Sequence, residues 1–181
     1  MTNLKTLYVS GYRTFELGIF KDKDPKIVII KKALKKQLIM YCESGLEWVI
    51  VSGNLGCEFW ATEVVGELKT EGYDLKLGLI TPYTDFEKKW NEANQHKFMQ
   101  MSQLADYQNS VSHEPYQHPS QLKNHSRFIL DHTDATLLVY DRDYPGKSEF
   151  FLKEIERFIN NNEYLIDLID MFSLQDAAES E

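Results

Sequence analysis

The chain has 181 residues, 43% of them hydrophobic, and a formal net charge of −8. This length and apolar content predict one domain with one sizeable core. No apolar run approaches the roughly 20 residues that span a bilayer, and the N-terminus lacks the pattern of a signal peptide, so we expect a cytoplasmic protein without membrane insertion. The two cysteines, Cys42 and Cys57, show no CxxC spacing and predict free thiols rather than a zinc site or a disulfide.

The negative charge is concentrated at the C-terminal end. Residues 158–181 contain no Lys or Arg, whereas six Asp and Glu residues fall there. The rest of the chain is close to neutral, and neither part has the basic stripe that binds a phosphate backbone, so we expect no nucleic-acid partner. We expect residues 1–170 to form the domain and residues 171–181 to form an acidic, mobile C-terminal tail.

Strands and helices alternate along the chain. Short β-branched runs predict strands buried on both faces, and apolar residues at helical spacing predict amphipathic helices. The alternation predicts an α/β protein of one domain, with a Rossmann-like, doubly wound, mostly parallel sheet and helices on both faces. In chain order we expect strand 4–9, helix 27–41, strand 48–51, helix 57–71, strand 75–80, a helical turn at 85–90, helix 95–104, strand 107–112, helix 119–131, strand 134–141, helix 149–160 and strand 164–169.

A long connection, residues 10–25, follows the first predicted strand. A connection of this length in a compact domain is more often functional than incidental. It contains Gly11, Tyr12, Arg13 and Phe15, and aromatic rings beside an arginine can stack on a flat ligand and pair with its phosphate. The alternative is that Phe15 fills the core beneath the loop.

The turn after the second predicted strand leads directly into a helix and contains Ser52, Gly53, Asn54 and Gly56. Glycines allow backbone conformations that are closed to other residues, and the first amides of a helix have no internal partner. Such a turn can therefore receive an anion or a ligand oxygen. The alternative is a tight strand-to-helix turn in which Ser52 or Asn54 caps the helix.

Three later segments also follow strands. Thr81 and Pro82 end the third strand, because proline cannot continue a central strand. Trp90 either packs against the sheet or overhangs the site as an aromatic wall. The loop from Asp141 to Ser148 lacks the first glycine of a P-loop, so we reject a Walker motif, but its small residues can still offer amides to a phosphate. No histidine pair has metal-ligand spacing, and we assign no metal.

Parallel strands bring these loops to one edge of the sheet. In doubly wound sheets, ligands bind beyond the carboxyl ends of the strands, where the strand order reverses. The sequence therefore predicts one ligand site at that edge. Its candidate ligand-binding residues are Gly11, Tyr12, Arg13, Phe15, Ser52, Gly53, Asn54, Gly56, Glu58, Thr81, Pro82, Trp90, Asp141 and Ser148.

Several motifs together resemble the YpsA-like family of bacterial proteins, and the resemblance covers nearly the whole chain. It is carried by Gly11–Arg13, Phe15–Phe20, Gly45–Trp48, Ser52–Ala61, Ile80–Pro82 and Asp131–Asp134. That family belongs to the SLOG group of Rossmann-like folds, which also contains DprA and the LOG phosphoribohydrolases. The resemblance implies a nucleotide-type ligand and a link with cell division in Gram-positive bacteria.

The chain departs from the better-known relatives in two places. LOG enzymes carry Pro-Gly-Gly-x-Gly-Thr-x-x-Glu after a late strand, whereas residues 141–149 contain one glycine. DprA-like proteins carry Ser-Gly-x-x-x-Gly-x-Asp, and the corresponding turn here is one residue shorter, with Glu58 at the acidic place. The first departure argues against a hydrolase, and the second indicates a similar turn for a different ligand.

We therefore expect a sensor or adaptor that binds a nucleotide, NAD or an ADP-ribose-like compound and passes its state to a cell-division protein. In this interpretation amides of residues 53–56 hold phosphate, Glu58 accepts a hydrogen bond from a ribose hydroxyl, and Arg13 pairs with charge. One alternative is an enzyme that cleaves an N-glycosidic bond with Glu58 as its catalytic carboxylate. Another is an interaction module whose ligand site is vestigial.

Overall fold

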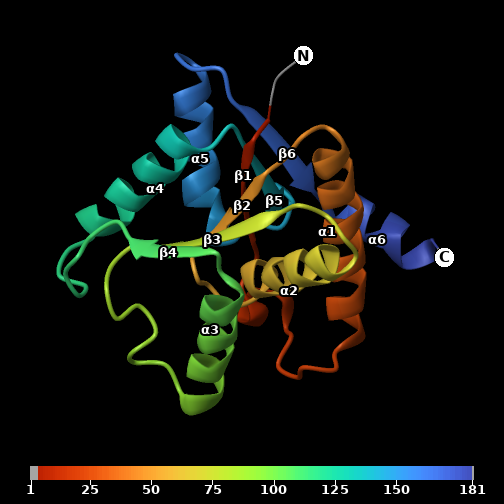
Figure 1. Cartoon of the computed structure of the whole chain (residues 1–181), viewed down its shortest axis with the longest axis horizontal. Helices are drawn as coiled ribbons and strands as arrows, with labels where there is room; N and C mark the ends of the chain where they lie inside the picture. Colours follow the sequence, from red (N-terminus) through yellow and green to blue (C-terminus); the bar gives the residue numbers. More distant parts are fainter. Residues whose placement is uncertain (1–3, 181) are drawn as a thin grey trace.

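A computed structural model describes residues 4–180, which form one parallel six-stranded sheet with helices on both faces (Figure 1). The predicted fold class is confirmed. No helix among these residues is long and apolar enough to cross a bilayer. In chain order the elements are β1 (Thr6–Gly11), a 3₁₀ turn (Thr14–Leu17), α1 (Pro25–Glu43), β2 (Trp48–Val51), α2 (Cys57–Thr70), β3 (Lys76–Thr81), α3 (Glu92–Leu104), β4 (Tyr107–Ser110), α4 (Ser120–His132), β5 (Ala135–Val139), α5 (Ser148–Ile159), β6 (Leu165–Ile169) and α6 (Met171–Glu179).

The strand order is β4-β3-β2-β1-β5-β6, and every pairing is parallel. The chain builds the sheet outward from β1 to β4 and then returns to add β5 and β6 on the other side of β1. The strand order therefore reverses between β1 and β5, which is where doubly wound sheets bind ligands. Gly11, the last residue of β1, pairs with Val139, the last residue of β5.

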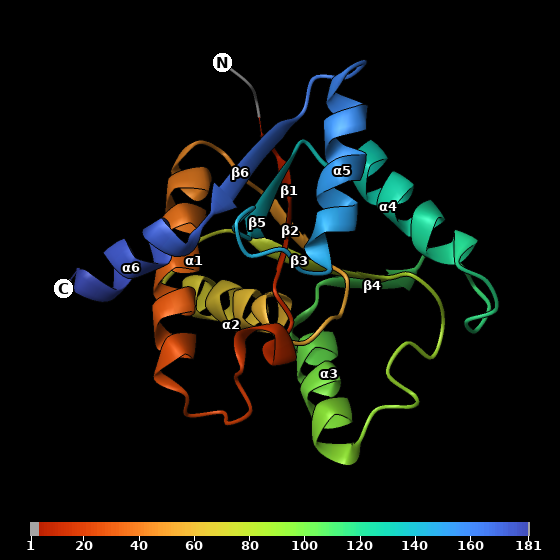
Figure 2. The ribbon, with the colours of Figure 1, turned by 180° about the vertical axis from the view of Figure 1, so that it is seen from behind.

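The two faces of the sheet differ in what covers them. Helices α1, α2 and α6 lie together on one face, and α4 and α5 lie on the other (Figure 2). Successive side chains of a strand point to opposite faces. In β1, Leu7 and Val9 accordingly join the main core under α1 and α2, whereas Tyr8 packs in a smaller cluster with Ile129 of α4 and Phe151 of α5.

The C-terminal segment differs from the sequence prediction. Residues 171–179 form α6, which packs against α1, and Leu174 and Ala177 are half-buried against the main core. Asp170 caps this helix by accepting a hydrogen bond from the amide of Ser173. The acidic composition concealed a short apolar stripe at helical spacing, and this stripe gives the segment a face to bury.

Candidate functional site

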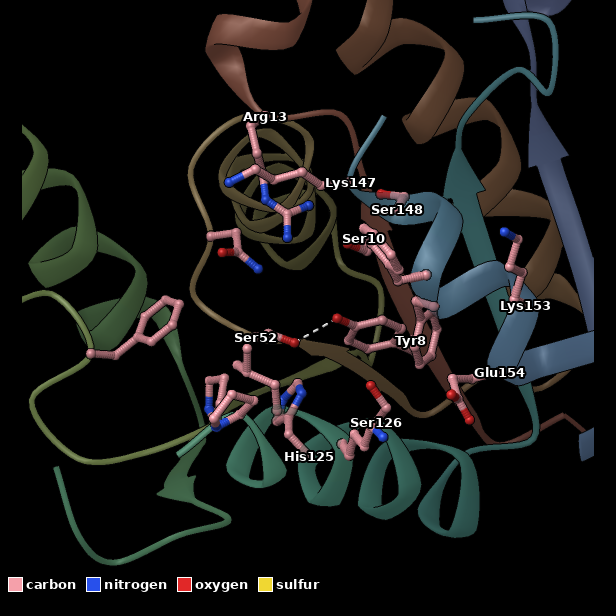
Figure 3. A pocket seen from close by; sticks show the side chains of 18 of the residues that line it. Tyr8, Ser10, Arg13, Ser52, His125, Ser126, Lys147, Ser148, Lys153 and Glu154 are labelled. Atoms are coloured by element: carbon pink, nitrogen blue, oxygen red, sulfur yellow. Dashed lines mark hydrogen bonds between the residues drawn. The ribbon is translucent and has the colours of Figure 1, made fainter. Parts of the chain in front are cut away.

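A cavity of about 550 Å³ lies beside the carboxyl ends of β1 and β2, on the face that α4 and α5 cover (Figure 3). Strand β1, the turn after β2, the loop after β3 and both helices contribute to its wall. The lining residues are Tyr8, Ser10, Arg13, Ser52, Asn54, Pro82, Phe86, Pro119, Leu122, Lys123, His125, Ser126, Lys147, Ser148, Phe150, Phe151, Lys153, Glu154 and Arg157.

Positive charge dominates the cavity wall although the molecule is acidic. Five lining side chains are Lys or Arg, and one, Glu154, is acidic. Two of the cations have carboxylate partners, because Lys153 Nζ lies 3.5 Å from Glu149 Oε1 and Arg157 Nη1 lies 3.1 Å from Glu154 Oε1. Within residues 4–180, the lining cations that form no ion pair are Arg13, Lys123 and Lys147.

Apolar side chains form much of the remaining wall. Phe151 packs edge-on against Tyr8, with ring centroids 5.1 Å apart. Phe150, the preceding residue of α5, is 75% exposed, and Phe86 and Leu122 line the cavity from the loop after β3 and from α4. A cationic cavity with aromatic walls suits a ligand that combines anionic groups with a flat ring.

The main-chain amides of two cationic residues, Arg13 and Lys147, both donate to the carboxylate of Glu16. Glu16 accepts a hydrogen bond from the Arg13 amide at 2.8 Å through Oε1, and one from the Lys147 amide at 2.8 Å through Oε2. Tyr12, which is buried, donates a hydrogen bond to the carbonyl of Tyr144 at 2.7 Å. These bonds tie the loop after β1 to the loop after β5, so that the side chains of Arg13 and Lys147 lie near each other in Figure 3.

Glu58 is buried beneath the cavity and is 1% exposed. One carboxylate oxygen accepts from the amides of Ser52 and Asn54, at 2.6 and 3.3 Å. The other accepts from Ser10 Oγ at 2.8 Å and from Asn54 Nδ2 at 2.9 Å. A buried carboxylate is tolerated when such donors compensate for the lost water. Glu58 therefore holds three lining residues in place and does not itself line the cavity.

Tyr8 forms the polar part of the floor together with Ser52. The hydroxyl oxygens of the two residues are 2.5 Å apart, as the dashed line in Figure 3 shows. Burial, reinforced by the nearby charge of Glu58, raises the pKa of Tyr8 well above its ordinary value. The phenol is therefore neutral near pH 7 and serves as a hydrogen-bonding group.

His125 of α4 reaches the floor from the opposite side. Its Nε2 lies 2.8 Å from the carbonyl oxygen of Ile80. A carbonyl only accepts, so Nε2 carries the proton. Burial lowers the pKa of His125, against the opposing effects of the Ile80 carbonyl and the Glu58 charge. The imidazole is therefore neutral near pH 7, and its second nitrogen, Nδ1, is a hydrogen-bond acceptor.

Two glycines shape the turn between β2 and α2. Gly53 has φ 97°, and a Cβ added there would lie 2.9 Å from the ring of Phe98. Gly56 has φ 100°, and its added Cβ would lie 2.5 Å from the carbonyl oxygen of Tyr12. Both positions require glycine because of the backbone conformation and because of the close neighbour. The Cys57 amide donates to Tyr12 O at 3.1 Å, and this bond uses the first amide of α2 internally.

The cavity brings together Arg13, Ser52, Asn54, Pro82 and Ser148 among the residues that the sequence predicts for the site. Gly11 supports two of them, because its carbonyl accepts from Arg13 Nη1 at 2.9 Å and from Ser148 Oγ at 3.2 Å. Gly53, Glu58 and Tyr12 lie behind the wall, and Gly56 borders a separate cavity of about 240 Å³ on the side of α2.

The remaining predicted residues lie outside the cavity. Thr81 Oγ1 donates to the carbonyl of Tyr83 at 3.1 Å, and Asp141 accepts from the amide of Met171 at the start of α6. Phe15 is 55% exposed, with Lys147 Nζ 5.3 Å from its ring centroid. Their contact with a ligand stays a prediction.

Trp90 packs against the core, which is the first of the two alternatives that the sequence left open. It is half-buried against the main core and packs edge-on to Phe86 and Phe98, with ring centroids 5.5 and 5.9 Å away. Phe86, and not Trp90, provides the aromatic wall on this side of the cavity.

Sequence reasoning missed the contributions of strand β1 and of helices α4 and α5. A signal was present in β1, because Thr6, Tyr8 and Ser10 place three hydroxyl groups on one face of a strand whose other face carries Leu7 and Val9. In α5, helical spacing alone places Lys147, Phe150, Phe151, Glu154 and Arg157 along one face. What the spacing could not show is that this face borders a cavity.

Comparison with known proteins shows the family of this chain. The YpsA family model, described as the YspA SLOG family, matches residues 7–174. The chain belongs to the YpsA family. A UPF0398 protein from Enterococcus faecalis is 55% identical over 177 residues, which are 98% of each chain. UPF0398 proteins from Ligilactobacillus salivarius and Staphylococcus haemolyticus are each 45% identical over 173 residues, covering 96% of this chain and 94% and 92% of theirs. The YpsA-family match spans β1 to α6 and therefore includes every element that lines the cavity.

Proposed function

We propose that this chain binds a nucleotide or nucleotide-derived metabolite in the cavity between β1, α4 and α5, and that it acts as a cytoplasmic sensor or adaptor. The ligand class comprises adenine nucleotides, NAD and ADP-ribose-like compounds. By family resemblance, the partner that distinguishes the ligand-bound from the ligand-free form is a protein of bacterial cell division. The observation that carries the proposal is the cationic lining of a cavity at the strand-order reversal of a molecule whose net charge is −8.

The chemistry of the wall supports a ligand with separate anionic and aromatic parts. Arg13 and Lys147 lie together at the edge of the sheet, where a phosphate can pair with both. The phenyl rings of Phe86, Phe150 and Phe151 offer apolar surface for a flat ring. These cations and phenyl rings are sufficient for binding such a ligand, which requires no catalytic group.

The geometry around Glu58 supports binding over N-glycosidic cleavage. Both carboxylate oxygens already accept two hydrogen bonds each from Ser10, Ser52 and Asn54. A carboxylate that is 1% exposed and held in this way cannot reach a bond of a ligand in the cavity. Glu58 is therefore a positioning residue for the turn between β2 and α2.

Thermal unfolding with a panel of AMP, ADP, ATP, NAD and ADP-ribose tests the proposal. A ligand at about 100 times its Kd adds about 2.7 kcal/mol to the free energy of unfolding. For a domain of this size the midpoint Tm should rise by about 5 to 11 °C. No shift with any compound at millimolar concentration would refute the proposed function.

Charge-removing variants locate the site. Arg13→Gln and Lys147→Gln should each weaken the binding of a hit roughly ten- to a hundredfold, because each removes a charge-assisted hydrogen bond. Lys36→Gln, an exposed position of α1 on the other face of the sheet, is the control and should leave affinity unchanged. Hits should also release no free base on prolonged incubation. Base release that disappears in a Glu58→Gln variant that is still folded at the assay temperature would favour the N-glycosidic alternative.

A further inference from the structure

Three polar groups on the cavity wall have already used their hydrogen-bond donor inside the protein. Ser10 Oγ donates to Glu58 Oε2 at 2.8 Å, and Ser148 Oγ donates to the carbonyl of Gly11 at 3.2 Å. The third is the neutral His125, whose Nε2 donates to the carbonyl of Ile80 at 2.8 Å. The three groups come from β1, α5 and α4, so they converge on the cavity from different elements.

These donors cannot be turned toward a ligand without leaving a buried acceptor unsatisfied. Ser10, Ser148 and His125 are at most 7% exposed. Their partners are a buried carboxylate and two main-chain carbonyls, none of which can donate in exchange. Each side chain therefore presents only lone pairs to the cavity: one hydroxyl oxygen from each serine, and Nδ1 from the imidazole.

Lone pairs repel a phosphate oxygen and attract an O–H or N–H group. The phosphate of a ligand is thus directed to Arg13, Lys147 and Lys123, the lining cations without ion pairs among residues 4–180. Ser148 follows Lys147 directly in the chain, and its Gly11 carbonyl partner also accepts from Arg13. An acceptor therefore lies beside the phosphate-binding cations, where a nucleotide carries its ribose hydroxyls.

We propose that Ser10, Ser148 and His125 form an acceptor-only set that selects ligands by their hydrogen-bond donors, so that the site prefers ribonucleotides with an amino-bearing base over 2′-deoxy and deaminated analogues. This inference rests on the proposed function and specifies its substrate class. Ser10 and Ser148 accept a hydrogen bond from a ribose hydroxyl, and His125 accepts one from an amino group of the base.

Equilibrium binding of AMP, 2′-deoxy-AMP and IMP to the whole chain, by calorimetry, tests the inference. 2′-Deoxy-AMP lacks one donor and should bind roughly two- to tenfold more weakly than AMP. IMP replaces the amino group with a carbonyl acceptor that would face Nδ1 of His125. IMP should therefore bind more weakly than AMP by at least the same roughly two- to tenfold factor.

The ratios of dissociation constants in variants separate recognition from general destabilisation. In Ser10→Ala or Ser148→Ala the deoxy-to-ribo ratio should fall toward one, whereas the IMP-to-AMP ratio should persist. In His125→Leu the IMP-to-AMP ratio should fall toward one, whereas the deoxy-to-ribo ratio should persist. Lys36→Gln, the exposed position of α1 on the other face of the sheet, is again the control and should leave both ratios unchanged.

The outcomes distinguish this inference from the proposed function. A ratio above two in the wild type that disappears in its matching variant supports the acceptor-only set. AMP binding that depends on Arg13 but gives ratios near one, or ratios that persist in every variant, overturns the inference and leaves the proposed function standing. A lack of AMP binding while another compound of the panel binds also overturns the inference alone. If no nucleotide binds, both fall.

Discussion

Glu58 shows what a single buried side chain contributes at the residue scale. The sequence places it where a ribose-binding carboxylate is expected, but its four donors come from Ser10, Ser52 and Asn54 within the protein. The carboxylate thereby fixes the orientation of a cavity hydroxyl and the path of the turn after β2. Its contribution to ligand binding is indirect.

Replacing Glu58 by Gln should destabilise the fold. A glutamine amide has one oxygen and one NH₂ group. The NH₂ group must therefore face two of the four donors whose hydrogen bonds the carboxylate now accepts. Each buried donor left without an acceptor costs about 1 to 3 kcal/mol, so we expect a loss of about 2 to 6 kcal/mol in the free energy of unfolding. Urea denaturation measures this loss. Glu67→Gln, an exposed residue of the same helix, is the control, and equal midpoints for the two variants would contradict the role assigned to Glu58.

At the scale of elements, α6 completes the layer that α1 and α2 begin. It follows β6 directly, and Asp170 stands at its N-cap with φ −89° and ψ −178°. The amide and the hydroxyl of Ser173 both donate to Asp170 Oδ1, at 2.8 and 2.9 Å. These hydrogen bonds lower the pKa of the Asp170 carboxyl. A short helix with no fully buried residue depends on such a cap.

Asp170→Ala should lower the free energy of unfolding by about 1 kcal/mol at pH 7, the typical cost of losing an N-cap. For a domain of this size the Tm should fall by about 2 to 4 °C. The folded-state pKa is lowered, so the stabilisation is present above the unfolded pKa of about 3.9 and is lost as the pH falls through the folded value. The difference between wild type and variant should therefore shrink in acid. Asp176→Ala removes the same charge from an exposed position of α6 and should have a smaller effect that does not fade in this way.

At the scale of the whole molecule, charge is segregated. The chain carries a formal net charge of −8, yet the cavity wall holds five cations and one carboxylate. A field of this kind draws small anions into a pocket while the outer surface repels polyanions. The arrangement suits a small phosphorylated ligand better than a long nucleic acid.

We accordingly expect no binding to single-stranded DNA at physiological salt, because most non-specific affinity comes from a continuous basic surface that follows the phosphate backbone. A gel-shift titration with an oligonucleotide checks this expectation. Micromolar binding that weakens with added salt would contradict it. In that event Lys123→Gln and Lys147→Gln would show whether the cavity cations form part of a longer groove.

Much of the fold could be predicted from the chain alone. The apolar runs at 48–51 and 134–141 and the helical spacing after Cys57 indicated the strands and helices correctly, because burial on both faces and on one face leave different periods in a sequence. The loops after strands were also placed at the right edge, since parallel connectivity leaves no other position for them. The error at residues 171–179 arose because acidic composition outweighed a stripe of only a few apolar residues.

The sequence by itself determined the α/β fold, the glycine-dependent turn after β2 and the family to which the chain belongs. Only the tertiary structure decided that Glu58 faces inward, that Tyr8 and Ser10 face the cavity, and that α4 and α5 bring His125 and Lys147 to the same space. The physical reason is that local periodicity records which residues are buried, whereas a site depends on which surfaces meet. Strand β1, the turn after β2, the loop after β3 and helices α4 and α5 together create this cavity, and the residue pattern of any one of them carries no information on the others.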